Sequence, residues 1–113
     1  MKIYHNPRCS KSRQTLELLR ERGIEPEVVE YLKTPPGEAE LARLLEQLGI
    51  GARELLRTKE PEYQALGLDD PGLDDTALIR GMVEHPKLIE RPIVVQGKRA
   101  VLGRPPEKVL ELL

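Results

Sequence analysis

The residues best suited to chemistry in this 113-residue chain gather near its start, in residues 5–12 (HNPRCSKS). This segment holds Cys9, the only cysteine of the chain. The thiol follows the turn-forming pair Asn6-Pro7 and precedes a run of helix-forming residues. A cysteine at a helix N-terminus lies beside unpaired backbone N–H groups and the positive end of the helix dipole, which favour the reactive thiolate. We therefore predict that Cys9 is a nucleophile rather than a small buried core residue.

The neighbours of Cys9 in the sequence are polar or cationic, which is unusual for a core position. Ser10 and Ser12 can offer O–H donors to a thiolate, and His5 can supply a positive charge or a hydrogen bond. Further positive charge comes from Arg8, Lys11 and Arg13. The same helix N-terminus is suited to bind an anion.

Several other sites are excluded by spacing. A Cys-x5-Arg phosphatase loop needs arginine at position 15, which is Thr15. A Walker loop needs Gly-Lys-Ser/Thr, which does not occur. Cys9 and His5 with the distant His85 fall short of a metal-ligand set, so we expect no metal, and we expect His85 at a helix end on the surface.

The spacing Cys9-x-x-Ser12 has serine where a dithiol redox protein carries its second cysteine. An adduct formed on Cys9 must therefore be cleared by an external thiol.

The composition of the chain argues against further classes of protein. The chain has 18 basic and 19 acidic residues, and this balance argues against a nucleic-acid binder. No apolar run approaches the length of a membrane span, and one cysteine cannot form an intrachain disulfide. We expect a soluble cytoplasmic protein with no membrane partner.

The elements that must position Cys9 follow from hydrophobic patterning. Short strands are expected at 2–4, 28–31, 92–95 and 100–102, with a hairpin turn at 96–98. Helices are expected at 12–22, at 41–48 with leucines at helical spacing, and from Pro105 to the C-terminus. Residues 51–86 carry only short helical patterns. The order predicts an α/β fold with a mixed sheet flanked by helices, as one domain over residues 1–113.

Four segments together resemble the glutaredoxin-coupled arsenate reductase family. They are residues 5–9 (HNPRC), 54–57 (ELLR), 90–95 (ERPIVV) and 103–105 (GRP). The resemblance covers the whole chain in order. It departs at Ser10-Lys11, where many arsenate reductases have Gly-Thr, so that Lys11 adds charge and bulk near the cysteine.

The resemblance implies a thioredoxin-like (glutaredoxin-like) fold with a helical insertion at about residues 37–88. In that fold the proline before the third strand is usually cis, and Pro92 holds this position. The resemblance also implies that Cys9 is catalytic, that His5 and Ser12 help to hold its thiolate, and that three arginines bind the substrate oxyanion: Arg57, Arg91 and Arg104. Guanidinium forks suit a dianion such as arsenate.

The function implied is reduction of arsenate to arsenite. Cys9 attacks arsenate, glutathione serves as co-substrate and glutaredoxin as partner, and no cofactor is bound. Two alternatives stay open: a thiol oxidoreductase acting on disulfides, and an adaptor that binds RNA polymerase, as related redox regulators do.

Overall fold

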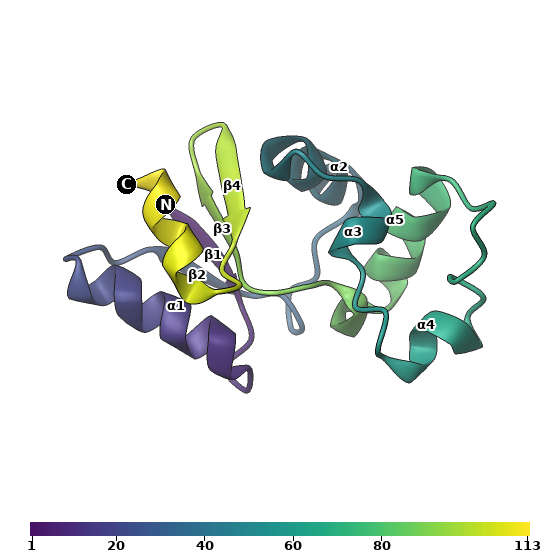
Figure 1. Cartoon of the computed structure of the whole chain (residues 1–113), viewed down its shortest axis with the longest axis horizontal. Helices are drawn as coiled ribbons and strands as arrows, with labels where there is room; N and C mark the ends of the chain where they lie inside the picture. The colour runs from purple at the N-terminus through teal and green to yellow at the C-terminus, as the bar shows by residue number, and fades with distance from the viewer. The chain divides into compact units, whose positions relative to one another are not determined.

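The computed structural model describes all residues, Met1–Leu113, and they form two compact units (Figure 1). The first, here called the sheet unit, comprises Met1–Thr34 and Arg91–Leu113. The second, the helical unit, comprises Pro35–Glu90. Its bounds agree with the helical insertion predicted at about residues 37–88, while a single domain over the whole chain stays a prediction.

A four-stranded mixed sheet is the centre of the sheet unit. Its strands are β1 (Lys2–His5), β2 (Glu27–Glu30), β3 (Ile93–Gln96) and β4 (Arg99–Leu102), in the order β2-β1-β3-β4. β1 pairs parallel with β2 and antiparallel with β3, and β3 pairs antiparallel with β4. All four strands agree with the sequence prediction to within about two residues, because short β-branched runs between turn residues mark them.

Helix α1 (Ser10–Glu21) and the C-terminal 3₁₀ helix η2 (Pro106–Leu112) pack against each other in this unit (Figure 1). Their apolar residues meet those of the strands in one buried cluster: Ile3, Leu16, Leu19, Val94, Val109 and Leu112. α1 is followed by Gly23, whose φ of 76° suits the chain reversal after a helix.

Two details of these helices differ from the sequence prediction. α1 begins at Ser10 rather than at residue 12, which brings Cys9 to its N-cap position. The last helix is 3₁₀ rather than α. Its N–H groups donate three residues back, as from Lys108 to Pro105 O at 3.0 Å, because seven residues that begin with proline have little length for α-helical bonding.

The helical unit contains α2 (Glu38–Leu48), α3 (Ala52–Leu55), α4 (Pro61–Ala65), α5 (Asp75–Glu84) and the 3₁₀ turn η1 (Pro86–Leu88). α2 packs on α5, and three leucines of the stripe that the sequence predicted, Leu41, Leu44 and Leu45, are buried. The helix ends at Gly49, whose φ is 70°. An isolated antiparallel bridge joins Leu56 to Ile89. None of the helices is both long enough and apolar enough to cross a membrane.

Candidate active site

Cys9 lies in a tight turn between the end of β1 and the start of α1. Its backbone N–H donates to the carbonyl of Asn6 at 3.0 Å, and the N–H of Arg8 donates to the Asn6 Oδ1 at 3.0 Å. The extended backbone of Cys9 (φ −91°, ψ 122°) makes it the N-cap of α1. The residue is 9% exposed. The sequence marked the Asn-Pro turn, but the role of the Asn6 side chain in holding it is visible only in the structure.

The surroundings of Cys9 favour its thiolate. Burial raises the pKa of Cys9, but the backbone N–H of Ser12 and the guanidinium of Arg91 together outweigh it. Arg91 acts both by a hydrogen bond to the sulfur and by its charge, and the N–H of Lys11 adds to the effect. The net result is a pKa below the ordinary value of a cysteine thiol, as expected for a sulfur at a helix N-terminus beside a cation.

Arg91 and Arg104 bring two guanidinium groups to this sulfur from the far end of the sequence. Arg91 directly precedes β3, and Arg104 follows β4. The Nη1 of Arg104 lies 3.9 Å from the Cys9 Sγ and donates to the carbonyl of Arg91 at 3.2 Å. Each arginine precedes a cis-proline, Pro92 and Pro105, of which the family resemblance implied the first.

His5 and Ser12 form a buried pair beneath the cysteine turn. The Nδ1 of His5 lies 2.5 Å from the Oγ of Ser12, which also accepts the N–H of Asn6 at 3.1 Å. The Ser12 hydroxyl therefore contacts the turn, and it is the backbone N–H of Ser12 that favours the thiolate. Burial lowers the pKa of His5 below its ordinary value; the charge of Glu30 opposes this effect, and the charges of Arg20 and Arg13 add to it. A catalytic role for this pair stays a prediction.

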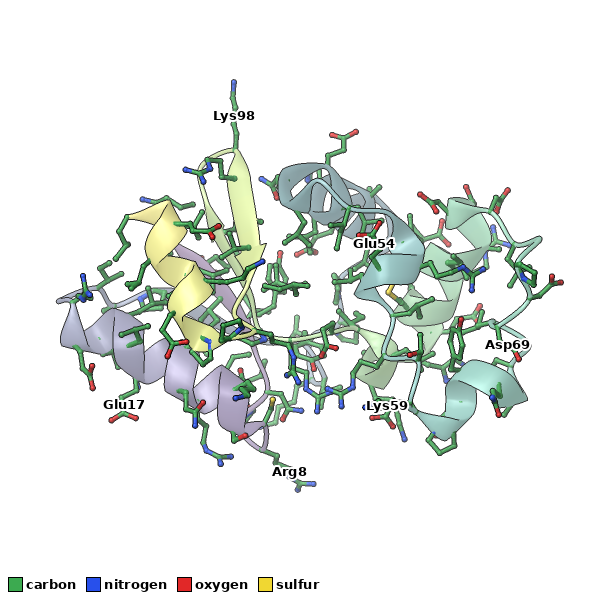
Figure 2. All side chains as sticks on the ribbon, in the orientation of Figure 1. Arg8, Glu17, Glu54, Lys59, Asp69 and Lys98 are labelled. Carbon is green, nitrogen blue, oxygen red and sulfur yellow. The ribbon has the colours of Figure 1, made fainter.

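The three other cationic residues near Cys9 in the sequence, Arg8, Lys11 and Arg13, are all exposed. The side chain of Arg8 is exposed and points away from the ribbon (Figure 2). Arg13 donates to the carbonyl of Pro7 at 3.0 Å and so holds the turn from the side of α1. The side chain of Lys11 is exposed.

Arg57 belongs to the helical unit. Its Nη1 lies 3.3 Å from Glu90 Oε1 and its Nε lies 3.4 Å from Glu60 Oε1, with the side chain 22% exposed. The backbone N–H of Arg57 donates to the carbonyl of Leu88 at 2.8 Å, beside the Leu56–Ile89 bridge. Two carboxylates thus hold this guanidinium within its own unit, and its binding of an oxyanion stays a prediction.

No group of three or more His, Cys, Asp or Glu side chains is arranged to hold a metal ion anywhere in residues 1–113. His85 lies at the C-terminal end of α5, as the sequence predicted, but it is half-buried there rather than on the surface. That the protein works without a bound cofactor stays a prediction.

A mixed sheet whose first strand leads into a cysteine at a helix N-terminus, with a cis-proline before β3, defines a thioredoxin-like protein. Residues 4–112 match the ArsC family, and the chain belongs to that family. This confirms the resemblance found in the sequence.

Individual relatives match over nearly their whole length. An Escherichia coli K12 protein named uncharacterized protein YfgD is 60% identical over all of this chain and 96% of its own. An arsenate reductase of Neisseria meningitidis serogroup A is 52% identical over all of this chain and 97% of its own. The solved structure of an arsenate reductase from Vibrio cholerae, 56% identical, superposes with a TM-score of 0.97 over all of this chain and 98% of that one.

Proposed function

We propose that this protein reduces arsenate to arsenite, with Cys9 as the nucleophile and external thiols as the source of electrons. The proposal rests on the groups that surround the sulfur of Cys9. Its pKa is lowered by helix N–H groups and by Arg91, and Arg104 approaches it to 3.9 Å. An ionised sulfur beside two guanidinium forks is suited to attack a tetrahedral oxyanion bound by those forks.

In the first step the Cys9 thiolate forms a sulfur–arsenic bond and one arsenate oxygen leaves as water after protonation. Arsenic stays in its oxidised state in this adduct. The thiolate of glutathione then attacks the arsenic of the adduct, and a second arsenate oxygen leaves as water, so that arsenic is bound to both the Cys9 sulfur and the glutathione sulfur. The thiolate of glutaredoxin attacks the glutathione sulfur and forms a mixed disulfide, and the electron pair of the glutathione–arsenic bond passes to arsenic. Arsenic thereby gains the two electrons that the two thiols lose. Water then attacks the reduced arsenic and breaks its bond to the Cys9 sulfur, which releases arsenite and the Cys9 thiolate.

Arg91 and Arg104 have two tasks in this proposal. Their charge lowers the energy of the thiolate, and their planar donors hold the arsenate oxygens as negative charge shifts from sulfur to oxygen. The family resemblance adds Arg57 as a third oxyanion ligand. His5 and Ser12 keep the cysteine turn in shape, so that the N–H groups of α1 stay directed at the sulfur.

The need for external thiols follows from the single cysteine. With no second thiol in the chain, Cys9 cannot resolve its own adduct. We propose glutathione and glutaredoxin as donors, with no bound cofactor, and hence a cytoplasmic reaction, since glutathione keeps thiols reduced in that compartment.

The relatives support this activity without deciding it. The Neisseria meningitidis protein is named an arsenate reductase, whereas the Escherichia coli relative at 60% identity carries no named activity. The proposal therefore needs an assay of this chain.

The assay supplies purified protein with arsenate, glutathione and glutaredoxin, and measures arsenite. We expect arsenite from the wild type, background from Cys9→Ser, and an unchanged rate from Ser10→Ala, whose side chain is exposed. Equal rates for wild type and Cys9→Ser would refute the proposal. A glutathione-mixed disulfide is assayed in parallel, and its turnover without arsenite formation would identify a thiol oxidoreductase of another substrate.

A further inference from the structure

Gly103 occupies the tightest glycine position in the protein, directly before Arg104. We infer that Gly103 is a positioning residue: its lack of a side chain lets the chain after β4 approach α1 closely enough for Arg104 to reach the sulfur of Cys9. This inference rests on the proposed function for its catalytic meaning, and its test uses no arsenate.

A Cβ atom at position 103 has no room. It would lie 2.5 Å from the Oγ1 of Thr15, 3.0 Å from the Cγ2 of the same residue and 2.9 Å from the Cγ of Pro92. Contacts this short do not occur between real side chains. The conflict is steric only, because Gly103 is not among the glycines with positive φ, and other residues can adopt its backbone conformation.

Neither neighbour can move aside without consequence. Thr15 is fully buried in α1, and its hydroxyl donates to the carbonyl of Lys11 at 2.8 Å and lies 3.4 Å from the carbonyl of Gly103. Because this side chain is branched, every staggered rotamer keeps the hydroxyl or the methyl in at least one of the two places that lie against position 103. Pro92 is buried beside β3, and its carbonyl accepts the N–H of Gly103 at 3.0 Å.

A methyl group at position 103 must therefore move the chain itself, and Arg104 moves with it. The contact of Arg104 with the Cys9 sulfur is 3.9 Å, already long for a hydrogen bond, and its bond to the Arg91 carbonyl is 3.2 Å. A shift of a few tenths of an ångström away from α1 weakens both. The thiolate then loses part of its cationic surroundings, and its pKa rises.

The helical unit offers a matched control. Gly37 also has an ordinary backbone conformation, with φ −82°, and a Cβ there would meet nothing within 4 Å. Gly37→Ala adds the same methyl group without a steric conflict.

The test is the pH profile of Cys9 alkylation by iodoacetamide. We expect Gly103→Ala to slow alkylation near pH 6 by about threefold or more, since below the pKa each tenfold loss of thiolate is a tenfold loss of rate. At high pH, where the thiol is fully ionised, we expect Gly103→Ala and the wild type to be alkylated at the same rate. Gly37→Ala leaves the whole profile unchanged.

The decisive comparison repeats Gly103→Ala in an Arg104→Ala background. If Gly103 acts by seating Arg104, the substitution has no further effect there. Equal slowing in both backgrounds, or no slowing in the folded Gly103→Ala protein, would overturn the inference.

A second variant covers the case in which Gly103→Ala does not fold. Adding Thr15→Ala removes the contacts at 2.5 and 3.0 Å and leaves the one to Pro92. The double variant should show a smaller slowing that again disappears with Arg104→Ala. Failure of both variants to fold would also overturn the inference, because Gly103 would then be required by the fold rather than by Arg104.

Discussion

The Oγ of Ser12 lies 2.5 Å from the Nδ1 of His5 and accepts the backbone N–H of Asn6. A hydroxyl has one O–H donor and two acceptor lone pairs, so the Ser12 Oγ can accept the Asn6 N–H and at the same time pair with His5 Nδ1. One buried hydroxyl thus joins the end of β1 to the first turn of α1, on either side of the cysteine.

This pairing predicts that Ser12→Ala destabilises the protein. The substitution leaves His5 Nδ1 and the Asn6 N–H without their partner in a buried place, at a cost of about 1–3 kcal/mol in the free energy of unfolding. Urea denaturation measures it. Ser10→Ala, an exposed position in the same turn of α1, serves as the control, with an expected change within about 0.5 kcal/mol. Similar effects of the two substitutions would contradict the role of this hydroxyl.

The same pair predicts a pH dependence of stability. Burial holds the pKa of His5 below its unfolded value of 6.5, so below about pH 7 the unfolded chain binds more protons than the folded one. The free energy of unfolding therefore falls as the pH is lowered through 6.5 toward the folded pKa. In urea denaturation from pH 7.5 to 5.5, His5→Gln should flatten this slope and His85→Gln should leave the His5 contribution in place. An unchanged slope in His5→Gln is the contrary result.

Arg91→Lys tests whether the planar guanidinium of Arg91, with its two parallel donors, contributes more to arsenate binding than its positive charge does. A lysine keeps the positive charge but cannot give two parallel donors to one oxyanion. We expect the KM for arsenate to rise by about tenfold, as for loss of one hydrogen bond to a charged group. Arg99→Lys, on the exposed side of β4, is the matched control and should leave KM unchanged. An Arg91→Lys enzyme with the wild-type KM would show that charge alone suffices.

Replacement of Arg57 tests whether this residue of the helical unit binds the oxyanion. Arg57→Ala removes a guanidinium and leaves the carboxylates of Glu60 and Glu90 without it. If Arg57 binds the oxyanion, the KM for arsenate should rise by about tenfold or more. Arg43→Ala, exposed on α2 of the same unit, controls for loss of one positive charge. A KM that moves equally in both variants would limit Arg57 to its ion pairs with glutamate.

The local features of the site could be predicted from the sequence because they depend on neighbours in the chain. A turn at Asn6-Pro7 followed by helix-forming residues is enough to bring Cys9 to a helix N-terminus. The strands and α2 were predictable in the same way, from β-branched runs and from leucines at helical spacing.

The contacts that refine the site could not be predicted, because they join distant parts of the chain. Thr15 and Gly103 are 88 residues apart, and only the packing of α1 against the segment after β4 shows why the glycine is needed. The pairing of Arg57 with Glu90 spans 33 residues and likewise has no local signal. The family resemblance implied that Arg57 binds an oxyanion, but it did not indicate which carboxylates hold this guanidinium.

Alkylation of Cys9 measured against pH, with and without arsenate, reports whether this sulfur is an ionised nucleophile beside an oxyanion site. We expect a pKa below that of an ordinary thiol and slower alkylation when arsenate is present, with both effects reduced in Arg91→Ala. A thiol that titrates at or above the ordinary value and reacts equally fast with and without arsenate would contradict this expectation.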